Sequence, residues 1–345
     1  MTTSELLRSF GRLRALVVGD ICLDRWCTYD PALSEPSRET GLDRIAVISE
    51  KQTAGGGGTV ANNLVAMGLA HVAALGLADD RGHGADLLHA LESRGIDAAA
   101  VLRSPSVRTF TYTKLLNART GAEDRPRIDF IQASPIPASL EIRIVDRLNE
   151  IHGRFDLIFV ADQAETETGG VITEAVRLAL AGIAREFPEK IIWADSRMRA
   201  ELFRNVTLKV NQAEADAACR RAFAEVDYER LRRWVGARRL FITRGGDPTI
   251  VHEEGRVVLV PVRRVENPVD ICGAGDAFSS GAACALALGA SAEEAAQAGS
   301  LVASATIMKQ GTGTASIEEL EHSLAGELSF RTGANPQAGQ GGERL

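Results

Sequence analysis

The chain has 345 residues, of which 45% are hydrophobic and 25% charged, and its formal net charge is −7. These values are ordinary for a globular protein, and the length fits one large domain with a small appendage or two domains. An acidic chain without a basic stripe excludes nucleic acid as the expected partner. No apolar run approaches the ~18 residues that span a bilayer, and the N-terminus lacks the pattern of a secretory signal. We therefore expect a cytoplasmic protein with no membrane partner.

The first half of the chain begins with a predicted buried strand at 14–19, which enters a polar turn at Asp20. Residues 26–52 look irregular, apart from a short strand at 44–49. The other elements predicted in this half are a helix at 62–67, a strand at 71–76, a helix at 86–94, and two strands at 109–116 and 127–131 that could pair.

The second half alternates more regularly between strands and helices. The predicted strands are 156–160, 190–194, 207–210 and 239–243, and the predicted helices between them are 173–187, 213–224 and 228–236. This order predicts an α/β fold, in which a doubly wound, mostly parallel sheet carries helices on both faces. A later edge strand at 257–262 and long apolar helices at 276–288 and 293–309 complete the domain.

Strand-like segments interrupt this alternation at about 25–54 and 106–132. They are expected to form a small β-sheet lid over a site at the carboxyl ends of the large sheet, where open α/β sheets bind ligands. The whole domain is expected to cover residues 11–325. Residues 326–345 have no apolar pattern and are expected to be disordered.

The most informative motif is Asp270-Ile-Cys-Gly-Ala-Gly-Asp276, directly before an apolar helix. Such a turn directs backbone N–H groups outward at a helix N-terminus, where a bound anion is favoured. Asp276 would sit beside this anion hole and could take a proton from an attacking hydroxyl group, as phosphoryl transfer requires. For the motif alone, a tight turn with a helix-capping Asp is the simpler interpretation.

A second glycine-rich turn, Gly55-Gly-Gly-Gly58, leads into the helix near Asn62. Its backbone could approach a ligand closely, or it could be a flexible turn. The chain has no GxxxxGK[ST] sequence, which excludes a P-loop. The turn also fails the dinucleotide-binding pattern, because no clean strand is expected directly before the glycines.

Carboxylates follow two of the predicted strands. Asp20 and Asp24 follow the first strand, where they could hold sugar hydroxyls or cap a turn. Asn211 and Glu214 follow the strand at 207–210, where their oxygens suit Mg²⁺ or could form a helix capping box.

Together these motifs resemble those of the PfkB/ribokinase family of carbohydrate kinases over roughly residues 14–325. Residues 270–276 match its DTxGAGD signature, Asn211 to Glu214 its NxxE metal motif, and Gly55 to Gly58 its glycine motif. Within the family, the chain is most similar to bacterial kinases of D-glycero-β-D-manno-heptose 7-phosphate. The segments that carry this likeness are 17–25, 113–115, 127–129, 242–244 and 311–314.

The resemblance implies a ribokinase-like fold and ATP-dependent phosphorylation of a hydroxyl group on a sugar or sugar phosphate. It implies ATP and Mg²⁺ as cofactors, leaves a K⁺ site near Asp270 open, and implies a homodimer formed through the lid. We expect no nucleotidyltransferase module after residue 325. The catalytic group is expected to be Asp276, with Gly273 in the same turn and an anion hole formed by the amides of Ala274, Gly275 and Asp276. The expected substrate-binding residues are Asp24, Gly56, Gly57, Thr59, Asn63 and Lys114. On the ATP side we expect Asn211, Thr243, Gly245, Gly311 and Gly313, with Glu214 and Asn211 as metal ligands.

The chain departs from the heptose kinase pattern on the substrate side. Cys272 and Thr59 replace a Thr and an Asn of the family, and Arg197 replaces a Lys. A phosphorylated substrate would need cationic partners, for which Lys114, Arg127, Arg197 and Arg199 are candidates, although all four could be surface charges. Two alternatives stay open. One is a kinase for another sugar, such as fructose phosphate, ribose or a ketodeoxy acid; the other is a non-catalytic sugar or nucleotide sensor.

Overall fold

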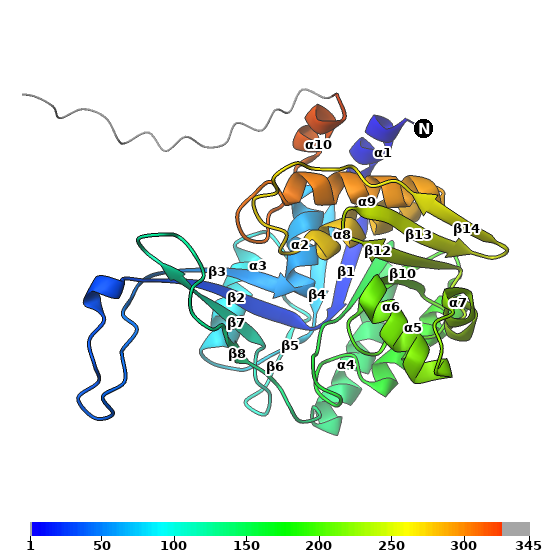
Figure 1. The fold of residues 1–345 in the computed structure, drawn as a ribbon. Helices are drawn as coiled ribbons and strands as arrows, with labels where there is room; N and C mark the ends of the chain where they lie inside the picture. The colour runs from blue at the N-terminus through cyan, green and yellow to red at the C-terminus, as the bar shows by residue number, and fades with distance from the viewer. Residues whose placement is uncertain (1, 326–345) are drawn as a thin grey trace, which may run out of the picture.

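The computed structural model describes residues 2–325 and is built around one large and one small sheet (Figure 1). The large sheet has eight strands in the order β14-β13-β12-β11-β10-β9-β1-β4. The strands from β4 to β12 are parallel, whereas β13 and β14 run antiparallel. Their bounds are β1 Arg14–Gly19, β4 His71–Leu75, β9 Leu157–Asp162, β10 Ile191–Ser196, β11 Thr207–Asn211, β12 Arg239–Arg244, β13 Asp247–Glu253 and β14 Arg256–Val260.

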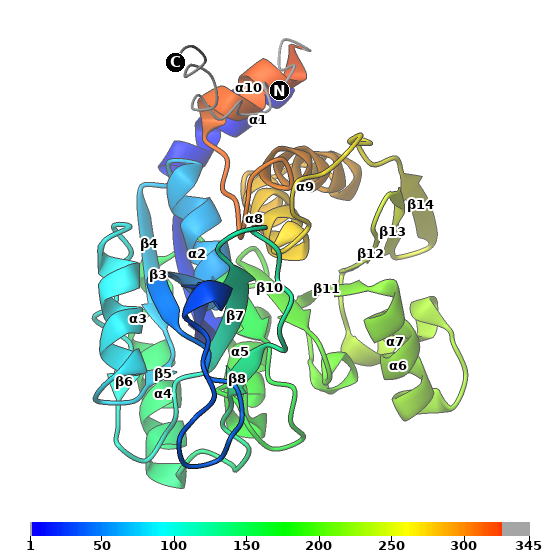
Figure 2. The ribbon, with the colours of Figure 1, turned by 60° about the vertical axis from the view of Figure 1, so that its left-hand side comes forward.

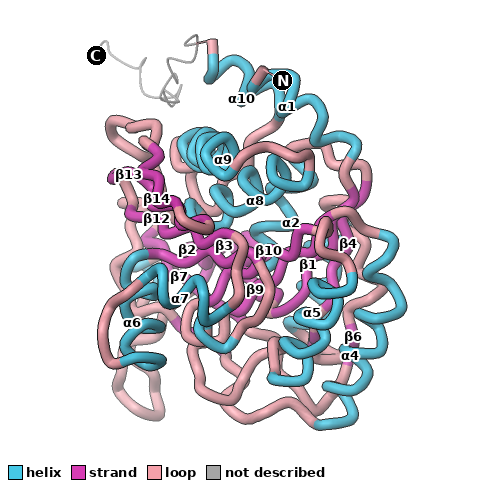
Figure 3. Tube along the Cα trace, turned by 90° about the vertical axis from the view of Figure 1, so that its right-hand side faces the viewer, coloured by secondary structure: helices cyan, strands magenta, loops and turns pink. Residues whose placement is uncertain are grey.

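Apolar side chains of the central strands alternate between two cores. In β1, Ala15 and Val17 join one core, and Leu16 and Val18 join the other. The first core is covered by α2 (Gly57–Ala66), α3 (His83–Glu92), α8 (Ala274–Ala287) and α9 (Ala292–Thr306). The second is covered by α4 (Ala138–Ile151), α5 (Glu174–Glu186), α6 (Gln212–Phe223) and α7 (Tyr228–Val235) (Figures 1 and 3). This confirms the predicted doubly wound α/β fold, because a strand buried on both faces needs helices on both.

The small sheet projects from one end of the large one (Figures 1 and 2). Its order is β3-β2-β7-β8, with bounds β3 Val47–Gly56, β2 Ile21–Tyr29, β7 Thr111–Asn117 and β8 Ile128–Phe130. A third, two-stranded sheet joins β5 (Leu77–Ala78) to β6 (Leu102–Arg103). The smaller sheet expected from the sequence is therefore present.

Two sequence predictions about this region need correction. Residues 30–46 form an irregular arm as expected, but the short strand expected at 44–49 is the start of the longer β3, and β2 extends into the range as far as Tyr29. A strand also directly precedes the glycine turn, since β3 runs to Gly56. The first six residues of β3 are exposed and Ser49 to Gln52 are polar, so the strand lacks the apolar pattern of a buried strand.

The remaining predicted strands and helices appear within a few residues of their predicted bounds, but the two-residue strands β5 and β6 and four longer elements were missed. The longer ones are β13, α4, and the terminal helices α1 (Thr3–Ser9) and α10 (Ile317–Leu324), which lie together through a hydrogen bond from Ser4 to Glu321. In residues 2–325, no helix is long and apolar enough to cross a membrane. The tail predicted to be disordered, 326–345, lies outside the described residues.

Candidate active site

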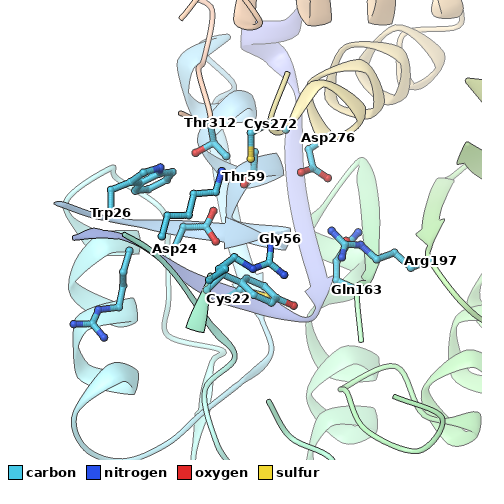
Figure 4. A pocket seen from close by; sticks show the side chains of 15 residues that line it. Cys22, Asp24, Trp26, Gly56, Thr59, Gln163, Arg197, Cys272, Asp276 and Thr312 are labelled. Carbon is cyan, nitrogen blue, oxygen red and sulfur yellow. The ribbon is translucent and has the colours of Figure 1, made fainter. Parts of the chain in front are cut away.

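A pocket lies between the small sheet and the carboxyl ends of β9 and β10 (Figure 4). Six residues predicted from the sequence line it, namely Asp24, Gly56, Thr59, Lys114, Gly273 and Asp276. Figure 4 shows the carboxylates of Asp24 and Asp276 pointing into the same space from different elements. The sequence therefore identified residues from four separate segments that the fold brings together.

Other lining residues were missed by sequence reasoning. Trp26 and Tyr112 come from β2 and β7, Gln163 follows β9, and Thr312 lies in the loop before α10. Trp26 belongs to the range that was predicted to be irregular, and Gln163 carries no charge that would single it out. Cys22 and Arg25, which were also missed, complete this part of the wall with Cys272, which the sequence placed on the substrate side.

The turn that starts α8 is stabilised by a glycine with a positive φ and by hydrogen bonds to the carboxylate of Asp270. Gly273 has φ 78°, a conformation that favours glycine. Asp270 accepts the amide of Cys272 at 2.9 Å and that of Gly311 at 3.1 Å, which joins this turn to the 311–314 loop. The Ala274 amide donates to the Ile271 carbonyl at 3.2 Å. This bond closes the turn at Ala274, and the expected role of the Ala274 amide in the anion hole stays a prediction.

The amides of Gly275 and Asp276 have no hydrogen-bond acceptor among the described residues. They belong to the first turn of a 14-residue helix, where N–H groups lack intrahelical partners. Two N–H groups at a helix N-terminus can hold an anion.

The Asp276 carboxyl is half-buried at the same turn. Burial raises its pKa to about 7, and the negative charge of Asp195 adds to this effect, while Lys209 and Arg197 oppose it. A carboxyl that titrates near neutral pH can both take up and release a proton there, which is the property of a general base.

Asp24 projects from β2 across the glycine turn. A methyl group added at Gly55 would lie 2.4 Å from the Asp24 carboxylate, so this side chain occupies the space that Gly55 leaves open. Burial raises the Asp24 pKa to about 6, against the nearby charges of Lys114, Arg127 and Arg197. A carboxylate here can accept hydrogen bonds from the hydroxyl groups of a sugar.

Four cationic residues line the pocket. Arg25 pairs with Glu50, and the three candidates from the sequence, Lys114, Arg127 and Arg197, face the pocket from the lid and from the end of β10. Each of these three candidates has an acidic partner, respectively Glu123 at 3.6 Å, Asp129 at 2.7 Å, and Glu165 in a short contact. The fourth candidate, Arg199, does not line the pocket. It is buried in an ion pair with Asp162 and supports the loop at Gly169.

Asp20 does not reach the pocket, although its sequence position resembled that of Asp24. Its buried carboxylate accepts three backbone amides, those of Gln163, Ala164 and Val171, at 2.7–2.9 Å. Burial and the charge of Asp162 raise its pKa to about 6. Asp20 thus supports the loop that carries Gln163.

Two predicted substrate residues have structural contacts instead of a place on the pocket wall. Gly57 donates its amide to the Asp20 carbonyl at 2.9 Å. Asn63 is fully buried, and its amide nitrogen donates to the Thr59 carbonyl at 2.9 Å. A substrate role for these two residues stays a prediction.

A buried ion pair that the sequence did not indicate lies behind the turn. The Lys209 ammonium lies 2.8 Å from the Asp195 carboxylate, which also accepts the Ser279 hydroxyl at 3.1 Å. Although burial favours the neutral amine, Asp195 and Glu214 hold the Lys209 pKa above its ordinary value. A Lys within a short strand gave no signal that separated it from a solvent-facing residue.

Asn211 and Glu214 form a reciprocal capping box at the start of α6. The Asn211 side chain accepts the Glu214 amide at 2.9 Å, and Glu214 Oε2 accepts the Asn211 amide at 2.7 Å. Glu214 Oε1 has no hydrogen-bond partner among the described residues. No group of three acidic, His or Cys side chains in residues 2–325 could hold a metal alone. One free carboxylate oxygen nevertheless fits Mg²⁺, which keeps several waters and takes its other ligands from phosphates.

The residues predicted for the ATP side lie beyond the pocket wall. Thr243 is the last residue but one of β12 and donates to the Val210 carbonyl at 3.5 Å. Gly245 follows the strand with φ 61° and open space around it. Gly311, with φ 74°, lies against the ring of Trp26, and Gly313 is crowded by the Thr306 carbonyl. Their contact with ATP stays a prediction.

Known proteins match this chain in sequence and in fold. A family described as "pfkB family carbohydrate kinase" matches residues 190–320. "Bifunctional protein HldE" of Geobacter sulfurreducens is 30% identical over 95% of this chain and 66% of its own length. The protein of that name from Geobacter metallireducens is 31% identical over 90% of this chain and 63% of its own length. The chain therefore spans slightly less than two thirds of these relatives.

Solved structures share the fold. A ribokinase from Thermotoga maritima aligns with a TM-score of 0.66 at 19% identity, covering 91% of this chain and 99% of its own. Phosphofructokinase-2 from Escherichia coli, solved in complex with potassium, aligns at 0.69 and 17%, with the same two coverages. Ribokinase from Arabidopsis thaliana, complexed with ribose and ATP, aligns at 0.64 and 16%, covering 90% and 98%. The solved structures show the fold alone, whereas the family match over residues 190–320 and the relatives in sequence identify the chain as a member of the pfkB family of carbohydrate kinases.

Proposed function

We propose that this protein transfers the γ-phosphoryl group of ATP to a hydroxyl group of a sugar phosphate, with Asp276 as the general base. The observation that carries the proposal is a carboxyl of pKa about 7 that faces the pocket beside two amides with no acceptor in residues 2–325. A base works best when its pKa lies near the working pH, and the amides can neutralise charge on the moving group.

In the proposed reaction the acceptor hydroxyl lies between Asp24 and Asp276. Asp24 accepts hydrogen bonds from neighbouring sugar hydroxyls and so fixes the orientation of the ring. Asp276 takes the proton as the hydroxyl oxygen forms a bond to the γ-phosphorus and the bond to the bridging oxygen of ADP breaks. The small sheet covers the pocket and limits access of water, which would compete as acceptor.

Mg²⁺ would be held by Glu214 and the ATP phosphates, and it neutralises charge on the phosphates when bound. The residues expected around the nucleotide are Asn211, Thr243, Gly245, Gly311 and Gly313. A requirement for K⁺ remains open and is tested by replacing K⁺ with Na⁺ in the assay.

The charges around the pocket favour an acceptor that already carries a phosphate. Lys114, Arg127 and Arg197 surround the Asp24 side of the pocket, where a neutral sugar would need no cation. Arg guanidinium groups bind phosphate through paired hydrogen bonds. The resemblance of segments 17–25 and 127–129 to heptose 7-phosphate kinases makes that sugar phosphate the first acceptor to test.

The test compares initial rates of ADP formation with matched sugars and sugar phosphates: heptose and heptose 7-phosphate, fructose and fructose 6-phosphate, ribose, and a ketodeoxy acid. We expect kcat/KM to be at least about 10-fold higher for a phosphorylated acceptor than for its neutral partner, because a charge-assisted contact to phosphate is strong. Changing Arg127 to Met should reduce this preference, and the exposed Arg233 changed to Met is the matched control. Equal rates with both members of every pair would contradict a phosphate-binding pocket.

We also propose that two copies associate through the lid. Exposed apolar side chains lie in the arm, at the start of β3, and in or next to β8; they are Leu42, Ile45, Val47, Ile48, Ile128 and Ile131. An exposed apolar margin on a small sheet is typical of a surface that another chain covers.

A further inference from the structure

Lys209 is a buried charge that the proposed reaction does not use. Its side chain is 6% exposed and lies in β11, inside the large sheet. Lysine is rarely buried to this degree without a partner, and here the partner is Asp195. The two residues face each other in the register of β10 and β11, so both side chains point to the same side of the sheet.

That side is the one covered by α8. Trp193, two residues before Asp195 on the same strand, packs in the core that α8 and α9 cover. Ser279 of α8 donates to Asp195, and a methyl group added at Gly275 would lie 3.0 Å from the Lys209 ammonium nitrogen. The ammonium therefore lies directly behind the residue that carries one of the two free amides.

We propose that Lys209 supplies a fixed positive charge behind the Gly275 turn, and that this charge stabilises the phosphoryl group during transfer. Lys209 is a positioning residue, because it acts across Gly275 and not by contact with the acceptor. The inference rests on the proposed phosphoryl transfer at the same turn.

Two observations favour this role over simple neutralisation of Asp195. An ammonium has three N–H groups, and only the contacts with Asp195 occupy it among the described residues. A buried ion pair is also no better for the stability of the fold than apolar residues of similar size. A contribution to stability alone therefore does not explain a Lys–Asp pair at this position. Close to the turn, a positive charge in a water-poor site acts more strongly than it would in solvent.

The test must separate charge from folding, because Lys209→Met leaves Asp195 buried without a partner. We therefore compare Lys209→Met with the double variant Lys209→Gln/Asp195→Asn, which is neutral and can keep one side-chain hydrogen bond. The proposal expects the double variant to melt close to the native protein but to lose kcat by about 10²-fold, the size typical of a lost anion-hole group. The KM for the acceptor should change less than about threefold, because the charge acts on the transferring group and not on the bound acceptor.

A second measurement needs no acceptor. Titration with ADP alone and with ADP plus aluminium fluoride, a planar mimic of the transferring group, reports on the anion hole directly. The double variant should bind ADP as the native protein does and bind the aluminium fluoride complex at least about 10-fold more weakly, because transition-state mimics depend most on the groups that stabilise the transition state.

A double variant with native kcat, or with native affinity for the aluminium fluoride complex, would mean that Lys209 only balances Asp195. A double variant that does not fold would show that the Lys209–Asp195 pair is required for folding, and this result would also overturn the proposal. Failure of the proposed function has a different signature, since the native protein itself would then form no ADP with any acceptor.

Discussion

Asp276 combines a role in the proposed reaction with a cost in stability. Its folded-state pKa is about 7, raised from 3.8 by burial and by the charge of Asp195. Between about pH 3.8 and pH 7, the Asp276 carboxyl keeps its proton in the folded chain but has lost it in the unfolded chain. The free energy of unfolding therefore falls as the pH rises from about 4 to about 7, because ionising the carboxyl is easier in the unfolded state.

Changing Asp276 to Asn should relieve this cost above pH 7. The variant should match the native protein near pH 4 and exceed its stability at pH 8 by roughly 1–2 kcal/mol, a value discounted for the partial exposure of the side chain. Thermal melting across pH 4–8 at constant ionic strength measures the difference. The exposed Asp146 of α4, changed to Asn, is the control and should show no such trend. An Asp276→Asn variant that is no more stable than the native protein at pH 8 would contradict this charge environment.

At the scale of the elements, the pocket depends on contacts between strand ends. Asp20 links β1 to β2 and uses both carboxylate oxygens to hold the 163–171 loop behind β9. The same residue accepts the Gly57 amide through its carbonyl, which fixes the start of α2. Three elements that border the pocket therefore meet at one buried residue.

Replacing Asp20 with Ala should destabilise the protein by about 3 kcal/mol or more, because three buried amides would lose their acceptor. The acceptor KM should rise as well, since Gln163 lines the pocket. Urea denaturation followed by circular dichroism measures the first effect. Asp156→Ala is the matched control, because Asp156 also accepts a backbone amide, that of Arg14, but at an exposed site. Similar losses for the two variants would show that burial is not the cause.

The sequence predicted the large sheet well because its strands follow one rule. Residues such as Ala15 to Val18 are apolar at every position, as strands covered on both faces must be. The lid strands β2 and β3 were missed as continuous elements because they mix charged residues with apolar ones and stand partly in solvent. Their pairing depends on the rest of the fold, which no local pattern contains.

The site was predictable where glycine and a charged residue stand together at fixed spacing, as at Gly273 and Asp276. It was not predictable for Lys209 and Asp195, which lie on neighbouring strands and are paired only by sheet register. Asp20 and Asp24 illustrate the same limit. Both are acidic and lie close together in the sequence, but only the fold decides that one is buried under backbone amides and the other faces the pocket.

At the scale of the whole molecule, the lid extends well beyond the main body (Figure 1). The proposed homodimer would cover its apolar margin. Size-exclusion chromatography with light scattering should give about twice the chain mass at micromolar concentration. Changing Ile48 and Ile128 together to Asp should shift the protein toward the monomer, since a charge is costly to bury without a partner. Ile142→Asp on α4, equally exposed but away from the lid, should leave the mass unchanged. A native protein that is monomeric at high concentration would contradict the lid interface.

The most direct measurement is the turnover of the Asp276→Asn variant, compared with the native protein at pH 8 using the best acceptor from the sugar panel. A general base contributes about 10²–10⁴-fold, so kcat should fall by that factor while the affinities for acceptor and ATP analogue stay within a few fold. Asp24→Asn, in contrast, should mainly raise the acceptor KM. Near-native kcat in the Asp276→Asn variant would contradict phosphoryl transfer assisted by this carboxylate.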